Sequence, residues 1–188
     1  YNQPKIDITE TEAIEETEKL LISACRYRMV ADVPVGVFLS GGYDSTAVTA
    51  LLQANQSDKL KTFTIGFHEE DHNEAPFARE VARHLGTDHT EYYCTTREAQ
   101  EILPTIPFYC DEPFGDSSFI PTTLVSRLAR QEVTVALSAD AGDEIFAGYP
   151  KYPLALDFLK KMSMVPGFMK TPAASIMQQM PDSWLIRL

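Results

Sequence analysis

Short apolar runs alternate along the chain with longer amphipathic segments. The runs are rich in β-branched and aromatic residues, which favours strands, whereas apolar residues spaced by three and four positions favour helices. Strands are expected over residues 33–39, 62–67, 89–94 and 133–137, and helices over residues 9–29, 74–85 and 97–106 and in segments beginning near Tyr43 and Pro121. This alternation predicts an α/β fold, a parallel twisted sheet with helices on both faces.

Local sequence signals mark several helix ends and the residues that each helix buries. Thr9 and Glu12 form a capping-box pattern at the start of the first helix, and Gly86 is typical of the residue that ends a helix. The expected buried residues are Ile14, Leu21 and Cys25 in the first helix, Ala47, Val48, Leu51 and Leu52 in the second, Phe77, Val81 and Leu85 in the third, and Leu124 and Leu128 in the helix near Pro121. Beyond Tyr149 the prolines predict short helices.

Two polar, glycine-containing loops follow predicted strands, at residues 40–45 and 138–144. In open parallel sheets, ligands bind beyond the carboxyl ends of the strands. The two loops are therefore the candidate functional site.

The first loop has the composition of a phosphate cradle. Gly41 and Gly42 allow a tight turn that directs backbone N–H groups toward one point, and the helix that follows adds its positive end. Ser40 and Ser45 add hydroxyl donors, and Asp44 would suit a Mg²⁺ ion bound between it and the phosphates. The lysine of a Walker loop is missing. The alternative is a simple turn in which Asp44 caps a helix.

The second loop places three carboxylates close together: Asp140, Asp143 and Glu144. Beside a phosphate site these groups would repel one another unless a cation intervened. A carboxylate that binds no metal could act as a base or orient an amine. The alternative is a solvated loop with two acidic residues at a helix start, where the helix dipole favours them.

Composition excludes several classes of partner. The chain has 188 residues, 44% of them hydrophobic, which fits one domain with a sizeable core, and its net charge is -11. Such an acidic surface repels nucleic acid and anionic lipid, so we expect neither as a partner. The three cysteines form no CxxC pair, no apolar run is long enough to cross a membrane, and the N-terminus is unlike a signal peptide. We therefore expect a cytoplasmic protein.

The motifs resemble those of a known family. Ser-Gly-Gly-Tyr-Asp-Ser at residues 40–45 resembles the pyrophosphate loop of the N-type ATP pyrophosphatases. The string from Ser138 to Tyr149 resembles the second signature of the asparagine synthetases, and the segment from Asp111 to Ser118 also looks like that family. The resemblance runs from about Thr11 to Tyr152 and implies a Rossmann-like fold of the adenine nucleotide alpha hydrolase type.

The resemblance assigns a role to each motif residue. ATP would be held by Leu39, Ser40, Gly41, Gly42, Asp44, Ser45, Ile65, Ser138 and Ala139, with Leu39 and Ile65 beside adenine. Mg²⁺ would be bound by Asp44 and Asp143, and Asp140 would assist the ammonia step or orient the acceptor. Asp116, Ser117 and Ser118 would face the acceptor pocket. Ala139 and Ala141 stand where the family usually has glycine, so either would be strained if its φ is positive.

The implied reaction is the ATP-dependent amidation of a carboxylate, with aspartate as the default acceptor and ammonia as the nitrogen donor. An acyl-adenylate forms, and AMP and pyrophosphate are released. In the family, a glutaminase domain of the same full-length chain supplies ammonia. We therefore expect residues 1–188 to be one synthetase domain, truncated at both ends and without its N-terminal glutaminase domain, in a possible homodimer. The alternatives are another PP-loop ligase, such as a β-lactam-synthetase-like or sugar-amidating enzyme, and a non-catalytic nucleotide-binding module.

Overall fold

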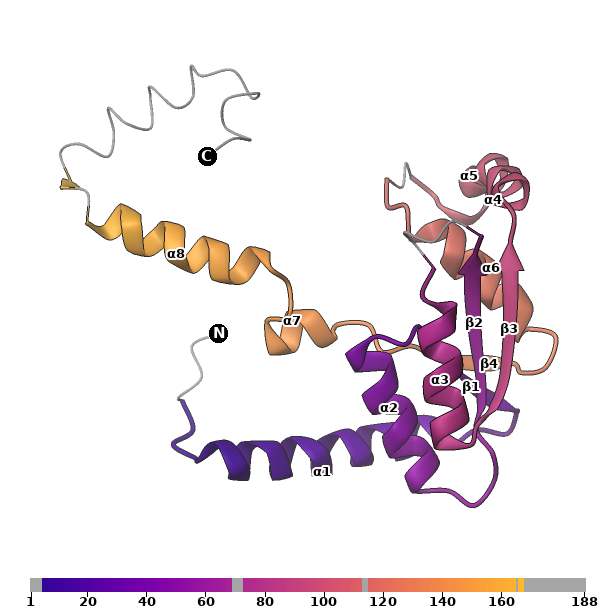
Figure 1. The fold of residues 1–188 in the computed structure, drawn as a ribbon, viewed down its shortest axis with the longest axis horizontal. Helices are drawn as coiled ribbons and strands as arrows, with labels where there is room; N and C mark the ends of the chain where they lie inside the picture. The colour runs from indigo at the N-terminus through magenta and orange to yellow at the C-terminus, as the bar shows by residue number, and fades with distance from the viewer. Residues whose placement is uncertain (1–4, 69–72, 113–114, 165, 168–188) are drawn as a thin grey trace. The chain divides into compact units, whose positions relative to one another are not determined.

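The computed structural model describes residues 5–68, 73–112, 115–164 and 166–167. The chain divides into two compact units, Tyr1–Asp140 and Ala141–Leu188. The first unit holds the sheet, and the described part of the second holds two helices (Figure 1). Each unit is described by itself.

The first unit contains a four-stranded, wholly parallel sheet. Its strands are β1 (Val35–Phe38), β2 (Lys61–Phe67), β3 (Asp88–Cys94) and β4 (Val135–Leu137). They lie in the order β3-β2-β1-β4, with β1 paired to both β2 and β4. The chain therefore builds the sheet outward from β1 on one side and then returns to add β4 on the other.

Helices cover both faces of this sheet, as predicted (Figure 1). Those of the first unit are α1 (Glu10–Met29), α2 (Tyr43–Ala54), α3 (Ala75–Leu85), α4 (Thr96–Ile102), the 3-10 turn η2 (Leu103–Thr105), α5 (Ile106–Tyr109) and α6 (Phe119–Ala129). Val37 packs with Cys25 of α1 and Leu52 of α2, whereas Phe63 packs with Val125 of α6 on the opposite face. Because successive strand residues point to opposite faces, each strand contributes to both layers.

The strand and helix positions predicted from the sequence are confirmed to within a few residues at most ends. The capping box of Thr9 and Glu12 is present, and Gly86 ends α3 in the left-handed conformation at φ 73°. The strand expected over residues 33–39 is shorter, and the helix expected over residues 97–106 divides into α4, η2 and α5 because Pro104 and Pro107 interrupt it.

The predicted buried residues of α2 are partly wrong. Its most buried side chains are Ser45, Thr49 and Leu52, and Ala47 is exposed. Two polar residues can be buried here because both hydroxyls are hydrogen-bonded: that of Thr49 donates to the carbonyl of Ser45 at 2.7 Å, and that of Ser45 donates to the carbonyl of Gly42 at 3.3 Å.

The predicted buried residues of α3 are also partly wrong. Phe77 is 68% exposed, and the buried residues are Ala75, Ala78 and Ala82. Small side chains are required because the first turn of α3 lies directly against Gly41 and Gly66. Elsewhere, Ile14 of α1 is 60% exposed, and α6 buries the neighbours of the two predicted leucines, Val125 and Ala129.

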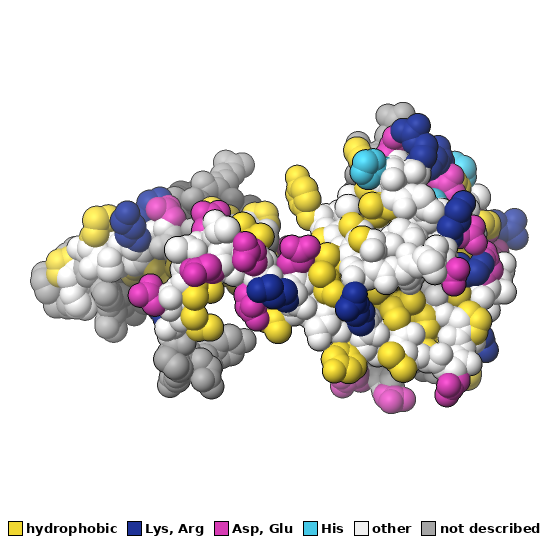
Figure 2. Space-filling view, turned by 90° about the horizontal axis from the view of Figure 1, so that it is seen from below, with side chains coloured by type: hydrophobic (Ala, Val, Ile, Leu, Met, Phe, Trp, Pro, Cys, Tyr) yellow, Lys and Arg dark blue, Asp and Glu magenta, His cyan; other side chains and the backbone are white. Residues whose placement is uncertain are grey.

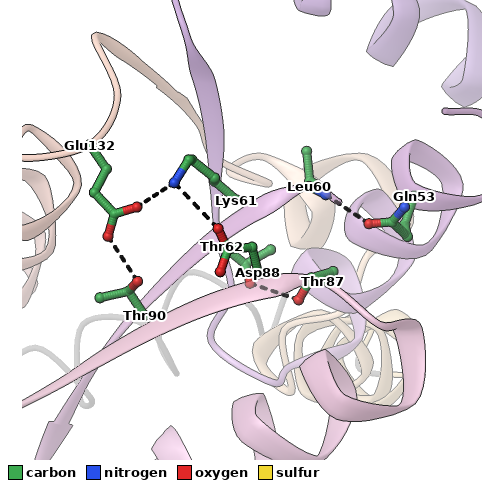
Figure 3. Close-up of polar contacts among 8 residues, drawn as sticks. All are labelled: Gln53, Leu60, Lys61, Thr62, Thr87, Asp88, Thr90 and Glu132. Atoms are coloured by element: carbon green, nitrogen blue, oxygen red, sulfur yellow. Dashed lines mark hydrogen bonds and ion pairs between the residues drawn. The ribbon is translucent and has the colours of Figure 1, made fainter. Parts of the chain in front are cut away.

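A polar network closes the amino-terminal end of the sheet (Figure 3). The Lys61 ammonium donates to Glu132 at 2.5 Å and to Asp88 at 3.3 Å, and the Thr90 hydroxyl donates to Glu132 at 3.0 Å. These contacts join the starts of β2 and β3 to the segment before β4. The two polar loops begin at the opposite, carboxyl-terminal end of the sheet.

The second unit contains α7 (Gly142–Phe146) and α8 (Lys151–Ser163). The helix predicted beyond Tyr149 is thus present as α8, and predictions that fall beyond residue 167 lie outside the described residues. Acidic, basic and apolar side chains are interspersed on the face of the molecule that Figure 2 shows. Within the described parts of the chain, no helix combines the length and hydrophobicity that crossing a bilayer requires.

Candidate functional site

The two candidate loops begin at the ends of neighbouring strands. β1 ends at Phe38 and β4 at Leu137, and the register pairs Val37 with Leu137. Because these strands are parallel, residues 39–45 and 138–140 leave the sheet at the same edge. The chain adds β2 and β3 on one side of β1 and β4 on the other, so this edge is the topological switch point, the usual ligand position in such sheets.

Gly41 occupies a backbone position that only glycine fits without strain. Its φ is 86°, in the left-handed region. A Cβ at this position would lie 2.7 Å from the backbone nitrogen of Ala78 and 2.8 Å from Cβ of Phe77. The turn that shapes the first loop therefore depends on a close backbone contact with α3.

The serines of the first loop make hydrogen bonds within the loop. The backbone N–H of Ser40 donates to the hydroxyl oxygen of Ser45 at 3.2 Å, and the two hydroxyl oxygens lie 2.9 Å apart. The N–H of Gly42 donates to the Ser40 hydroxyl at 3.3 Å. Helix α2 begins at the next residue without a side-chain cap, so the amides of its first turn are suited to an anion.

The two residues predicted to contact adenine point to different faces of the sheet. Leu39 is 1% exposed and packs with Ala78 and Ala82, whereas Ile65 packs in the cluster that contains Phe63 and Val125. The amide of Leu39 donates to the carbonyl of Phe63 at 2.9 Å, so that amide belongs to the sheet. Their contact with adenine stays a prediction.

The second loop begins with a short side-chain contact. The Ser138 hydroxyl donates to a carboxylate oxygen of Asp140 at 2.6 Å, and both residues are exposed. This contact turns the Asp140 carboxylate back toward the end of β4. Ala139, between them, is half-buried.

The expected strain is present at one of the two alanines that replace glycine. Of the non-glycine residues that the structure describes, Ala141 and Ala147 have positive φ, at 74° and 56°. They flank α7, Ala141 as its N-cap and Ala147 as its C-cap. Ala139 adopts no such conformation. Of the two alanines at positions where glycine was expected, only Ala141 therefore carries left-handed strain.

Asp143 is held against a glycine of its own unit. The N–H of Gly148 donates to the carbonyl of Asp143 at 3.0 Å. A Cβ on Gly148 would lie 2.1 Å from a carboxylate oxygen of Asp143. The carboxylate therefore occupies space that any other residue at position 148 would fill.

A second contact in this unit was not foreseen from the sequence. The Tyr149 hydroxyl donates to Glu144 at 2.7 Å, which raises the pKa of Tyr149 to about 12 and lowers the pKa of Glu144. The Lys151 ammonium lies 4.1 Å from the centre of the Tyr149 ring, a cation–π contact. The signal available in the sequence was a tyrosine one turn past the end of a short acidic helix.

The structure thus unites some of the predicted site residues and leaves others separate. Residues 39–45 and 138–140 lie at one edge of the sheet in the first unit, whereas Asp143 belongs to the second. The pairing of Asp44 with Asp143 around Mg²⁺ therefore stays a prediction, although carboxylate oxygens are the ligands that this ion prefers. Among the described residues, no group of three or more His, Cys, Asp and Glu side chains is arranged to bind a metal.

The segment predicted to face the acceptor lies directly before α6, with Ser118 as the N-cap of that helix. Asp116 accepts a hydrogen bond from the N–H of Ser118 at 2.8 Å, which lowers its pKa. Ser117 is exposed, and Pro113 and Phe114 lie outside the described residues. A role in acceptor binding stays a prediction.

Comparison with solved structures supports the fold. The glutamine-dependent NAD⁺ synthetase of Acinetobacter baumannii, determined in complex with ADP, matches with a TM-score of 0.53 and 22% sequence identity. The match covers 78% of this chain and 29% of that one. It confirms the expected Rossmann-like α/β architecture.

Sequence comparison identifies the family. A putative asparagine synthetase (glutamine-hydrolyzing) of Methanocaldococcus jannaschii is 44% identical over 152 residues, covering 79% of this chain and 29% of the relative. Asparagine synthetase (glutamine-hydrolyzing) 1 of Bacillus subtilis is 32% identical over 181 residues, covering 96% of this chain and 28% of the relative. The chain thus spans less than a third of the length of these relatives. The asparagine synthase family model matches residues 16–186, and the chain belongs to the asparagine synthase family.

Proposed function

We propose that this chain is the ATP-binding part of an enzyme that converts a carboxylate, aspartate by default, into an amide. The observation that carries the proposal is the glycine-containing loop at residues 40–45, which lies at the switch point of the sheet beside Asp140. Membership of the asparagine synthase family supports ATP-dependent amidation as the reaction class.

The proposed reaction has two steps. The acceptor carboxylate attacks the α-phosphorus of ATP, and pyrophosphate leaves as the acyl-adenylate forms. Ammonia then attacks the acyl carbon, AMP leaves, and the amide is formed. Catalysis of this type depends mainly on positioning the reactants and on neutralising charge.

The residues of the first loop would bind and orient the phosphates. Gly41 and Gly42 keep the turn narrow, and the hydroxyls of Ser40 and Ser45, which now contact each other, would turn to the phosphate oxygens. Asp44 is exposed in the first turn of α2 and would hold Mg²⁺ together with Asp143. The ion would supply positive charge to offset that of the pyrophosphate.

Asp140 would act in the second step. Its carboxylate lies at the end of β4, held by the Ser138 hydroxyl at 2.6 Å. From that place it could accept a hydrogen bond from ammonia and receive a proton as the amide forms. Ser138 would thereby keep the carboxylate oriented.

The proposal extends to the remainder of a longer protein. Both relatives are named as glutamine-hydrolyzing enzymes, and this chain spans less than a third of each. We assign the release of ammonia from glutamine to a glutaminase domain of the same full-length protein. The substrates of the full-length enzyme would be small cytoplasmic molecules, and the enzyme could act as a homodimer.

The strain at Ala141 supports one competing function. A left-handed alanine at the start of α7, with φ 74°, suits a site whose catalytic geometry has relaxed. In that case the domain would bind nucleotide without turning it over.

ATP–pyrophosphate exchange in the full-length protein tests the proposal. Wild-type protein is expected to exchange label only with Mg²⁺ and aspartate present, and Asp44→Ala is expected to abolish exchange. Exchange that depends on another carboxylate would keep the mechanism and change the acceptor. Nucleotide binding without exchange for any acceptor would refute the proposal in favour of the non-catalytic function.

A further inference from the structure

The first turn of α3 forms one wall of the glycine loop. The backbone nitrogen of Ala78 would lie 2.7 Å from a Cβ on Gly41, and Cβ of Ala75 would lie 2.9 Å from a Cβ on Gly66. Ala75 and Ala78 are both completely buried. This turn therefore rests on two glycines, one in the loop and one in β2, with no room for other side chains between them.

A single amide side chain ties this turn to the sheet. The Asn73 carbonyl oxygen Oδ1 accepts a hydrogen bond from the N–H of Ala75, at 3.2 Å, and a longer one from the N–H of Phe67, at 3.4 Å. Phe67 is the last residue of β2, and Ala75 is the first residue of α3. One oxygen atom thus links the start of α3 to the end of the strand, in addition to the packing of Ala75 and Ala78 on the two glycines.

The rest of α3 is attached to the sheet by other side chains. The Arg79 guanidinium contacts the carboxylate of Glu91 at 2.6 Å and donates to the Tyr93 hydroxyl at 2.9 Å. These contacts join the middle of α3 to β3. Loss of the Asn73 side chain would therefore loosen the first turn of the helix and leave its body in place.

We propose that Asn73 is a positioning residue for the phosphate loop, acting through the first turn of α3 on Gly41. This role rests on the proposed function only in that phosphate is assigned to the loop. If the first turn shifts by a few tenths of an ångström, the contact at Gly41 changes, and with it the direction of the loop amides. Asn73 itself need not touch the nucleotide.

Three variants of the full-length protein separate positioning from simple stabilisation. Asn73→Ala removes the acceptor oxygen, whereas Asn73→Asp keeps one at the same place and suits a helix start. Gly86→Ala is the matched control, because Gly86 ends the same helix at φ 73° in open space. It should destabilise α3 from the other end without affecting Gly41.

Calorimetric binding of Mg-ATP and of Mg-pyrophosphate provides the readout, with thermal unfolding measured in parallel. Asn73→Ala is expected to weaken the binding of both ligands by about fivefold, because the two lost hydrogen bonds are not made to the ligand and only part of their contribution reaches the loop. Gly86→Ala should lower the unfolding temperature and bind normally, and Asn73→Asp should restore binding to within about twofold.

The outcomes distinguish this inference from the proposed function. Equal binding by Asn73→Ala and Gly86→Ala, or wild-type protein that binds neither ligand, would overturn the inference. Failure of Asn73→Asp to restore binding would also count against it. Binding that follows the expected order, in a protein that shows no ATP–pyrophosphate exchange, would support the inference and refute the proposed function.

Discussion

Replacing Ala141 with glycine should stabilise the turn that starts α7. Ala141 has φ 74° and ψ 6°, where its Cβ crowds the following carbonyl oxygen. Ala139 lies two residues earlier and is not left-handed. Ala139→Gly is therefore a matched control, the same chemical change at a position that gains nothing from it.

The magnitude follows from two opposing terms. Left-handed backbone costs an alanine about 1–2 kcal/mol, which glycine would release. Glycine also has more freedom in the unfolded chain, which costs about 0.5–1 kcal/mol. Ala141→Gly should therefore stabilise the turn by about 0.5–1 kcal/mol, whereas Ala139→Gly should destabilise its surroundings by a similar amount.

Native-state hydrogen exchange in the full-length protein measures the effect locally. The Ile145 amide donates to the carbonyl of Ala141 at 3.1 Å, and the Gly148 amide donates to that of Asp143 at 3.0 Å. Both amides should exchange about two- to fivefold more slowly in Ala141→Gly. Faster exchange in that variant, or the same change in both variants, would refute the assignment of strain to Ala141.

Three further substitutions follow from the sheet and the first loop. Gly41→Ala should cost about 2–4 kcal/mol of stability in a denaturant titration and abolish Mg-ATP binding, since it adds left-handed strain and a clash with α3. Gly42 has φ -69°, and a Cβ there would be at ordinary contact distance, so Gly42→Ala should have little effect on stability in the same titration. Lys61→Met should cost less than about 1 kcal/mol, because its ion pairs are half-exposed, and this cost should shrink in high salt. The hydrogen bond from Lys61 lowers the pKa of Glu132, so the stability from this pair is full above the unfolded pKa of Glu132 and is lost as pH falls through its folded pKa. Denaturant titrations should therefore show a smaller difference between wild type and Lys61→Met at pH 3 than at pH 7. Burial lowers the pKa of His89, so the stability of the wild type should decrease as the pH drops below about 6.5, the ordinary histidine pKa. His89→Gln should lose less stability between pH 7 and pH 5.

The sheet and the place of the first loop were predictable because they depend on patterns within short segments. Apolar runs located the strands, and two glycines after such a run located the turn. The order β3-β2-β1-β4 was not predictable from these patterns, since strand order depends on tertiary packing. It is this order that places residues 39–45 beside residues 138–140.

Burial was harder to predict than secondary structure. Hydrophobicity favoured Phe77 and Ala47 for the core, yet α3 buries alanines where its backbone approaches Gly41 and Gly66. Close backbone contact between elements distant in sequence leaves no local pattern. The role of Asn73 was missed for the same reason, because its two partners belong to different elements.

The position of β4 also has consequences for how the chain folds. β4 pairs with β1, although all of β2, β3 and the helices between them separate the two in sequence. Closing so long a loop is slow, so this pairing should form late in folding. During synthesis, the edge of β1 that pairs with β4 stays unpaired until β4 has left the ribosome. That open edge is a place where a nascent chain could aggregate or bind a chaperone. The proposed nucleotide site, which needs residues 39–45 and 138–140 together, would then form only after β4 has docked on β1.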